Sequence, residues 1–356
     1  MKRSAPGTVL IFVGPLPPPI HGQSVATHAL RDLLIKSDVR IRVIDNGPGL
    51  HGGLIRRLIR EGKAHLLVIL SPARTLYTSV NSNFGIFATI LLCLIARLRR
   101  KRIMLHHHSY RYIGQSGALM AILARVSGPA ATHIVNCPEM GRQLKAQYST
   151  VKRTLSYSNV GVVDRRLRPV SRTQSELVLG HMSNLTQEKG LNRTIDAFRE
   201  VRRCWPEAQL RLAGPCAEVS AEQTIANATA EFGAAFHYDG PVYGDDKQKF
   251  FSRIDVFVFP SLYAVETQGI VNLEALACGR PVVAFAQCCI PGDIGNDGGH
   301  AVPRDADFSQ ALIEYLHRYL QDRSGASRRA RQQFETILQT HAVERAELLQ
   351  DLGKRA

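Results

Sequence analysis

Two carboxylates eight positions apart, Glu266 and Glu274, lie in the stretch of this sequence whose chemistry is easiest to interpret. Glu274 belongs to a predicted short helix, about Ile270–Ala277, that is apolar on nearly every side. A carboxylate on such a helix is costly to bury unless another group satisfies it. Glu266 precedes the start of the helix, where free N–H groups attract an anion. Two carboxylates that bind hydroxyl groups on either side of a diphosphate would suit a nucleotide sugar.

The elements around this pair indicate a parallel α/β unit. An apolar strand is predicted at Val256–Phe259, followed by a loop and the short helix, and a second strand begins at Pro281. Gly279 can end the helix in the left-handed C′ position. Other strands alternate with helical stretches along the chain, which predicts parallel, doubly wound sheets. They are Val9–Val13, Arg40–Ile44, Leu66–Leu70, Ile103–Leu105, Thr132–Asn136 and Leu210–Ala213, together with a strand that begins at Leu177.

The segment from Pro260 to Phe285 resembles the signature of the retaining glycosyltransferases of family 4, which have the GT-B fold. It contains Glu266, seven residues, Glu274 and then Ala-Leu-Ala-Cys-Gly-Arg-Pro-Val-Val. The resemblance implies two Rossmann-like domains with doubly wound parallel sheets that face a cleft. We expect an acceptor-side domain at 1–170 and a donor domain at 171–330. The final helix of such proteins commonly crosses back to the first domain, an arrangement that residues 331–356 could adopt.

The resemblance also implies roles for individual residues of the second domain. Lys189 matches the lysine that holds the leaving diphosphate, Glu266 would bind sugar hydroxyls, and Glu274 would bind the ribose. The family usually has an arginine where this chain has Asn184, which can form hydrogen bonds but supplies no charge. Val242 and Tyr243 match a segment that contacts the base, although the end of a core strand explains them equally well. The implied catalytic residues are Lys189, Glu266 and His108, and the implied donor-binding residues are Gly22, Asn184, Lys189, Val242, Glu266, Gly269, Ile270, Val271 and Glu274.

Two features of the first half are open to a functional and a structural interpretation. Gly22, in a proline-rich loop, matches a family glycine that lets the backbone approach the donor phosphates, but its neighbour is His21 rather than a second glycine. A plain strand-to-helix turn is the alternative. His106, His107 and His108 follow a strand, so at most the first and third converge, and no nearby carboxylate or cysteine completes a metal site. The resemblance places His108, or secondarily His106, near the donor sugar and acceptor; a structural hydrogen-bonding histidine is the alternative.

Composition and charge limit the class of protein. The chain has 356 residues, 45% of them hydrophobic, which suits a globular protein of two domains. Residues 1–172 carry 26 Lys and Arg against 6 Asp and Glu, a net charge of +20, and the remainder carries −5. The basic half indicates an anionic partner, such as nucleic acid, anionic lipid or a diphosphate-linked acceptor. The seven scattered cysteines form no C-x-x-C pair and favour a reducing, cytosolic setting.

Membrane-related signals in the sequence are weak. Met1–Gly7 leads straight into a strand and does not resemble a secretory signal. The most apolar run, Phe84–Ala96, falls short of the ~20 residues that span a bilayer and ends in a basic segment, 97–102. It predicts either a buried helix with a solvated basic end or an interfacial helix held at anionic headgroups.

Together these observations predict a retaining hexosyltransferase that moves a sugar from a nucleotide-diphosphate sugar to a saccharide acceptor. The basic half gives the further hypothesis of a lipid-linked acceptor at the cytoplasmic face of the membrane, in the assembly of a cell-surface polysaccharide. We expect no cofactor and no essential metal. The alternatives are a basic nucleic-acid-binding or scaffold protein, and a catalytically inactive relative of the family. Sparse aromatic residues and the lack of a recognition motif argue against nucleic acid as the partner.

Overall fold

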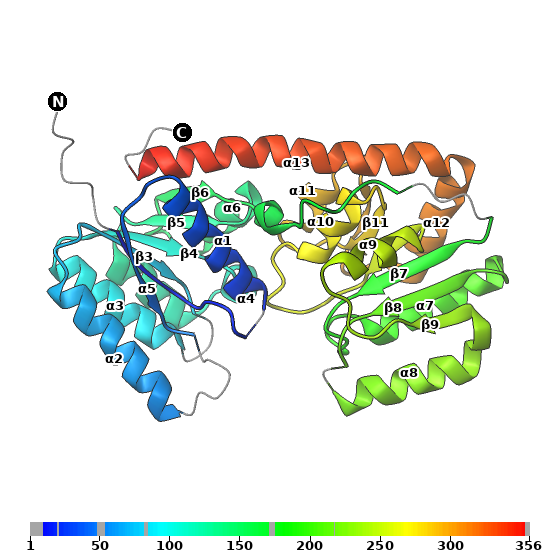
Figure 1. Ribbon diagram of the computed structural model, residues 1–356, viewed down its shortest axis with the longest axis horizontal. Coiled ribbons are helices and arrows are strands. Elements are labelled where there is room, and N and C mark those ends of the chain that lie inside the picture. The colour runs from blue at the N-terminus through cyan, green and yellow to red at the C-terminus, as the bar shows by residue number, and fades with distance from the viewer. Residues whose placement is uncertain are drawn as a thin grey trace. The chain divides into compact units, whose positions relative to one another are not determined.

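The computed structural model describes residues 10–19, 21–47, 54–81, 85–170, 175–216 and 218–352 (Figure 1). The chain divides into two compact units, of which the first comprises residues 1–162 and 340–356 and the second residues 163–339. Val9, Phe84 and the N-terminal Met1–Gly7, which appear in the predictions above, lie outside the described residues. No helix within the described ranges combines the length and the apolar character that crossing a membrane requires.

The first unit contains a parallel sheet of six strands in the order β2-β1-β3-β4-β5-β6. Its centre is fully buried: Phe12 of β1 stacks on Tyr77 of β3, with ring centroids 4.3 Å apart. The strands are β1 (Leu10–Gly14), β2 (Ile41–Asp45), β3 (Thr75–Ser79), β4 (Arg102–His106), β5 (Thr132–Val135) and β6 (Arg153–Ser156). The helices between them are α1 (Gly22–Lys36), α2 (Leu54–Leu70), α3 (Gly85–Leu98), α4 (Arg111–Gly114), α5 (Ala118–Ser127) and α6 (Pro138–Gln147), followed by a 3₁₀ turn (Asn159–Val162).

One predicted strand of this unit is wrong. Leu66–Leu70 forms the end of α2, and the strand that follows is Thr75–Ser79. Five consecutive apolar residues fit a buried strand or a helix equally well. In the helix Ala64 and Val68 are fully buried, whereas Leu66 and Leu70 are exposed. The true strand, with the sequence TLYTS, contains too many hydroxyl side chains to have the apolar pattern of a buried strand.

The second unit repeats the architecture with a sheet in the order β12-β11-β10-β7-β8-β9. The strands are β7 (Val178–Met182), β8 (Gln209–Ala213), β9 (Phe236–Tyr238), β10 (Val256–Phe259), β11 (Val282–Phe285) and β12 (Gly299–Val302). The helices are α7 (Leu191–Cys204), α8 (Val219–Phe232), α9 (Asp245–Ser252), α10 (Ile270–Ala277), α11 (Ile290–Ile294) and α12 (Phe308–Gln321), with a 3₁₀ turn at Gly233–Ala235.

The predicted strand, loop and helix around the two carboxylates are confirmed. β10 and α10 have the expected bounds, and Gly279 follows α10 with a φ of +69°. The α/β class with two doubly wound parallel sheets is also confirmed. Because the strands of each sheet are parallel, their carboxyl ends share one edge, where α/β proteins of this kind bind ligands.

The last helix, α13 (Arg323–Asp351), begins in the second unit, and its residues from Thr340 onward belong to the first. Leu348 and Leu349 are buried in the core of the first unit. The carboxylate of Glu344 accepts a hydrogen bond from the backbone N–H of Ser158 at 2.9 Å. Asp351 forms ion pairs with Arg102 and Arg153, at the starts of β4 and β6. The C-terminal part of the helix is therefore an integral part of the first unit.

Candidate active site

The centre of the candidate site is an ion pair between Lys189 and Glu266, which follow the adjacent strands β7 and β10. The Lys189 Nζ lies 2.5 Å from one carboxylate oxygen of Glu266, and the other accepts a hydrogen bond from the Gly269 N–H at 3.1 Å. The same ammonium group lies 4.4 Å from the centroid of the Tyr263 ring. The side chains are 22% and 13% exposed, so both charges are partly desolvated but within reach of a ligand.

Two glycines bring these loops together. Gly190 has a φ of +92°, and a Cβ there would overlap the carbonyl oxygen of Pro260, so the loop after β7 packs directly on the end of β10. Gly269 has a φ of +65°, and a Cβ there would lie 2.7 Å from the side-chain amide nitrogen of Asn272. Only glycine adopts these conformations at little cost. Lys189 is therefore held close to Glu266 by the backbone that precedes Gly190.

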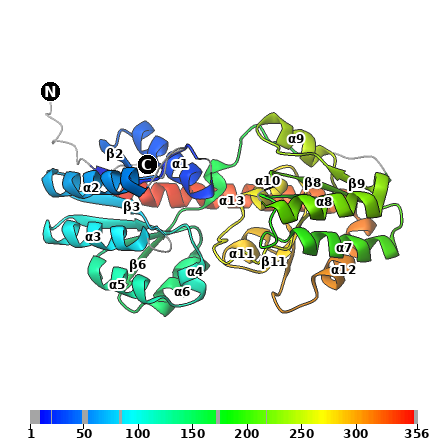
Figure 2. The ribbon, with the colours of Figure 1, turned by 90° about the horizontal axis from the view of Figure 1, so that it is seen from below.

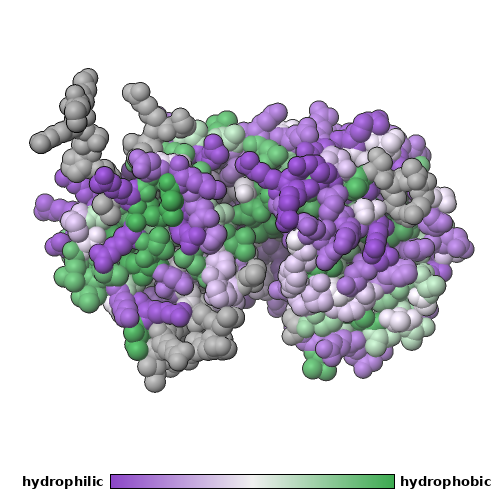
Figure 3. All heavy atoms as spheres, in the orientation of Figure 1, coloured by the Kyte–Doolittle hydropathy of each residue, from purple (hydrophilic) through white to green (hydrophobic). Residues whose placement is uncertain are grey.

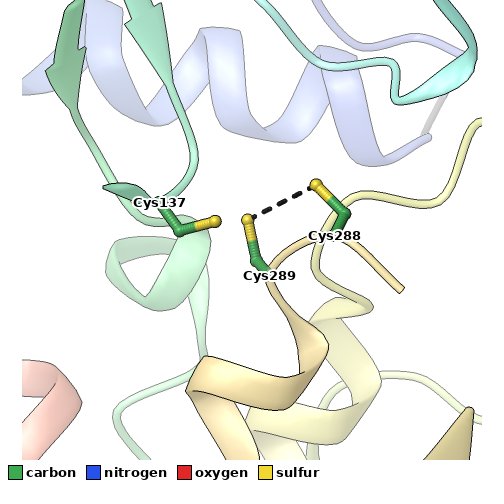
Figure 4. A group of neighbouring side chains, drawn as sticks. All are labelled: Cys137, Cys288 and Cys289. Carbon is green, nitrogen blue, oxygen red and sulfur yellow. Dashed lines mark hydrogen bonds between the residues drawn. The ribbon is translucent and has the colours of Figure 1, made fainter. Parts of the chain in front are cut away.

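The loop after β11 fastens the loop that carries Glu266. The Gln287 side-chain amide donates to the carbonyl oxygens of Tyr263, at 2.8 Å, and Glu266, at 2.9 Å. The neighbouring Cys289 N–H donates to the carbonyl of Thr267 at 2.9 Å, and its sulfur lies 3.7 Å from that of Cys288 (Figure 4). These contacts could not be predicted from the sequence, because a polar residue after a strand is common.

The start of α10 offers donors to an anion. The first N–H groups of a helix have no partner within the helix, and Ile270 and Val271 at this position are only partly buried. Asn272 is 1% exposed, yet neither polar atom of its side chain has a hydrogen-bond partner among the described residues. A buried amide without partners is destabilising. The predicted residues Gly269, Ile270 and Val271 thus lie beside a further polar group that the sequence analysis missed.

Glu274 has a different lysine as its partner. Both of its carboxylate oxygens accept hydrogen bonds from the Nζ of Lys247 in α9, at 2.7 and 2.9 Å. Burial raises the pKa of Glu274, which is 4% exposed; Lys247 opposes this shift and Asp164 adds to it. Lys247 was not identified from the sequence, because nothing in its spacing connects it with Glu274. Since each carboxylate is paired with its own lysine, Glu266 and Glu274 do not form an acid–base pair.

The remaining predicted residues of the second unit lie near the ends of other elements. Asn184 is exposed in the loop after β7, and Ser183 donates a hydrogen bond to its carbonyl oxygen at 3.2 Å. Val242 is partly buried and Tyr243 is 63% exposed, both before α9. Within the described ranges, no hydrogen bond or ion pair joins the side chains of Asn184 or Val242 to the Lys189–Glu266 pair.

In the first unit, the three histidines at the end of β4 alternate in direction as expected. The rings of His106 and His108 lie 4.0 Å apart, and His106 Nδ1 lies 2.8 Å from the Tyr77 hydroxyl. His107 points elsewhere, with its ring nitrogens 2.9 Å from His133 Nδ1 and 3.1 Å from the Tyr112 hydroxyl. His107 therefore has a structural role. His108, which is partly buried, has no hydrogen-bond partner for its Nε2 among the described residues.

His21 has a role that a second glycine could not perform. It is the N-cap of α1, and its Nδ1 accepts a hydrogen bond from the Ser24 N–H at 3.2 Å, while the Ser24 hydroxyl accepts one from the His21 N–H at 3.1 Å. Gly22 is the exposed first residue of the helix, with open space where a Cβ would stand. Burial, followed by the nearby His21, lowers the pKa of His108 to about 3. Gly22 and His108 thus lie in one region of the first unit.

Comparison with known proteins identifies the second unit. The family described as "Glycosyl transferases group 1" matches residues 176–322. Residues 176–322 are thus similar to the group 1 glycosyl transferases. The match confirms the predicted resemblance to a glycosyltransferase family, which was drawn from the Glu266–Glu274 segment. The matched region contains both lysine–glutamate pairs.

Two curated proteins are similar to parts of this chain. The chain is 30% identical to "Sulfoquinovosyl transferase SQD2" of Arabidopsis thaliana over 175 residues, which cover 46% of this chain and 32% of the relative. It is 30% identical to a "GDP-mannose-dependent monoacylated alpha-(1-6)-phosphatidylinositol monomannoside mannosyltransferase" of Corynebacterium glutamicum over 151 residues, or 40% of this chain and 39% of the relative. The chain thus matches about a third of the length of these curated relatives.

Solved structures show that the fold of the whole chain is GT-B. Sucrose-phosphate synthase from Thermosynechococcus elongatus matches with a TM-score of 0.73 over 97% of this chain and 99% of that chain, at 16% identity. HepE from Anabaena, in complex with UDP and glucose, matches with a TM-score of 0.68 over the same shares, also at 16% identity. The GT-B fold predicted from the sequence is therefore confirmed.

The histidines of the first unit predict a loss of stability in mild acid. Burial holds the pKa of His106 and His107 well below 6.5 and lowers that of His133 to about 4. Below pH 6.5 the unfolded chain binds protons that the native unit does not, so the free energy of unfolding should fall as pH falls toward 4. The expected slope is about 1.4 kcal/mol per pH unit for each histidine, measured by urea unfolding between about pH 7 and about pH 5.

His133→Gln should flatten this pH dependence, whereas His28→Gln, at a side chain that is 43% exposed, should not. Equal slopes for the wild type and His133→Gln would contradict the assignment.

Lys247→Met should destabilise the second unit, because it leaves the Glu274 carboxylate buried without a cation. We expect a loss of about 3 kcal/mol at neutral pH, with Glu274→Gln in the same chain restoring most of it. A double-mutant cycle by chemical unfolding measures the coupling. Additive effects of the two substitutions would show that the pair does not act as a unit.

Proposed function

We propose that this protein is a retaining glycosyltransferase that moves a sugar from a nucleotide-diphosphate sugar to a saccharide acceptor. The observation that carries the proposal is the Lys189–Glu266 pair beside the start of α10, within a unit of the group 1 family. Relatives of the same fold support the donor class, since HepE was solved in complex with UDP and with UDP-glucose. Both curated relatives described above are named as sugar transferases.

In this proposal Lys189 stabilises the departing diphosphate. Negative charge develops on the phosphate as the sugar carbon acquires oxocarbenium character, so a fixed cation and N–H donors stabilise the transition state more than the bound donor. The N–H groups at Ile270 and Val271 would supply those donors, together with that of Gly269 once it no longer binds Glu266. The donor phosphate would replace the Glu266 carboxylate as the partner of Lys189. Glu266 would then accept hydrogen bonds from sugar hydroxyls.

Other residues would position the nucleotide and the acceptor. Glu274 would bind the ribose hydroxyls, while Lys247 stabilises its ionised form. Val242 would contact the base. Asn184, which replaces the usual arginine, would donate a hydrogen bond to the diphosphate without supplying charge. Gly22 would let the backbone approach the donor, and His108 would lie on the acceptor side. We expect no essential metal and no cofactor, because Lys189 and the N–H groups supply the electrostatic stabilisation.

Replacing Lys189 by alanine should lower kcat roughly 10²- to 10³-fold, as for other losses of a single transition-state donor. Glu274→Gln should mainly raise the KM for the nucleotide sugar. Both are measured with a donor found by a thermal-shift screen of UDP-, GDP- and ADP-sugars, in the presence of a metal chelator. The anomeric configuration of the product, determined by NMR, should equal that of the donor.

Lys249→Ala is the matched control, because Lys249 on α9 is 67% exposed and pairs only with a surface aspartate in the described structure. Wild-type rates in both Lys189→Ala and Glu274→Gln would overturn the assignment. Inversion of the anomeric centre would overturn the retaining mechanism alone.

We also propose that the acceptor is lipid-linked and that the protein acts at the cytoplasmic face of a membrane. The basic charge of residues 1–172 supports this, as does the name of the mannosyltransferase relative, which specifies a phosphatidylinositol monomannoside. A further support is a line of exposed apolar side chains along α3: Phe87, Leu91, Leu94 and Leu98 are 54%, 49%, 41% and 75% exposed. Figure 3 shows hydrophobic side chains on the surface of this unit.

The apolar line on α3 generates a prediction about vesicle binding. A double substitution, Leu91→Ser with Leu98→Ser, should weaken binding to anionic vesicles about tenfold or more. The reason is that two leucine side chains would no longer be buried in the membrane interface. Co-sedimentation at low salt measures it. Val219→Ser, at a valine of the second unit that is 83% exposed, should bind as the wild type does. Equal binding by all three proteins would exclude α3 from the membrane contact.

A further inference from the structure

A basic pocket lies at the end of α3 and the starts of β4 and β5, at the edge of the sheet opposite to His108. It has a volume of about 630 Å³ and is lined by five cationic side chains and by the turn that precedes β5. The cations are Arg97, Arg100, Lys101, Arg102 and Arg153. None of the lining residues is a carboxylate. A concave site with this charge suits an anion with several oxygens.

The protein only partly compensates this charge. Arg102 and Arg153 share one carboxylate, that of Asp351. Arg97 donates to the carbonyl oxygens of Arg125, at 2.9 Å, and Val126, at 3.1 Å. These contacts fix the guanidinium groups in place, and such groups can bind phosphate through two parallel hydrogen bonds.

Lys101 is held by backbone carbonyls rather than by an acid. Its Nζ donates to the carbonyl oxygens of Ser71, at 2.7 Å, and Ala73, at 2.6 Å. Carbonyl oxygens satisfy donors without removing charge. Five cations against the one shared carboxylate therefore leave an excess of four positive charges around the pocket.

Arg100 stands where a glycine would be more stable. The Lys101 N–H donates a hydrogen bond to the Ala96 carbonyl, and the Arg100 N–H donates one to the Arg97 carbonyl. These are the two hydrogen bonds of a Schellman motif, which ends α3. Arg100 occupies the left-handed position of the motif, with a φ of +51°, which glycine adopts with less strain. A strained residue held in place at the rim of a basic pocket suggests a function for its side chain.

We propose that this pocket binds the phosphate headgroup of an anionic phospholipid. The inference rests on the membrane placement proposed above and names the partner of that surface. Arg97 and Leu98 are neighbours in α3, so the exposed apolar line of the helix ends directly beside the pocket. A phosphate in the pocket and acyl chains along α3 would occupy both features at once, as in proteins that lie in the membrane interface. Figures 1 and 2 show α2 beside α3, and α2 also carries exposed apolar side chains, including Leu66 and Leu70.

The test uses the full chain and substitutions of Arg100. Arg100→Gly removes the charge and relieves the backbone, so the variant should unfold at a higher temperature than the wild type and yet bind anionic vesicles about fivefold more weakly. Arg100→Lys keeps the charge and should bind as the wild type does. Binding is measured by co-sedimentation with phosphatidylcholine vesicles, with and without phosphatidylglycerol, at low ionic strength. Arg304→Gly, at an exposed arginine of the second unit, is the matched control and should bind normally.

Two outcomes would overturn the proposal, and one control separates it from the proposed glycosyltransferase activity. Wild-type binding by Arg100→Gly would overturn it. A thermal shift with inorganic pyrophosphate that depends on Arg100, without any vesicle binding, would also overturn it and assign the pocket to a soluble phosphate. Hydrolysis of the nucleotide sugar, measured without vesicles, should be equal in Arg100→Gly and the wild type. If no transfer or hydrolysis is found but the vesicle difference persists, the glycosyltransferase proposal fails and the headgroup site stands.

Discussion

The second unit depends on the compensation of two carboxylates that its fold removes from water. Glu266 is held by Lys189 and by the Gly269 N–H, and Glu274, which is almost fully buried, by both hydrogen bonds from Lys247. An ionised carboxylate at such positions would be strongly destabilising if it lacked its cation. The first pair joins the loops after β7 and β10, and the second joins α9 to α10, so the contacts that satisfy the charges also connect the elements of the site.

The parallel sheet is what makes these contacts available. β7 and β10 are neighbours, so the residues after their carboxyl ends meet at one edge. Gly190 then lets the first loop pack against the backbone of Pro260, and Gln287 fixes the second loop from the end of β11. The candidate site is therefore a set of loops supported by a parallel sheet.

The first unit combines a buried histidine cluster with a basic and partly apolar surface. Burial lowers the pKa of His106, His107 and His133, and His107 and His133 stabilise one another by a hydrogen bond rather than by charge. The positive charge lies instead on arginines and lysines around the end of α3, next to the exposed leucines of that helix. The buried histidines thus belong to the core of the unit, whereas the arginines and lysines at the end of α3 are available to an anionic partner.

The sequence by itself determined the fold class, the bounds of β10 and α10, and the similarity of the second unit to the group 1 glycosyl transferases. Each depends on local patterns: apolar periodicity, a glycine after a helix and the spacing of Glu266 and Glu274. It failed at Leu66–Leu70, where a short apolar run fits a helix or a strand. Only the tertiary structure decided that Lys247 is the partner of Glu274, that Gln287 supports the loop of Glu266, and that Asp351 reaches Arg102 and Arg153. These contacts join residues tens to hundreds of positions apart, and no local preference of the chain encodes which of many surface lysines or arginines the folded sheet brings to a given carboxylate.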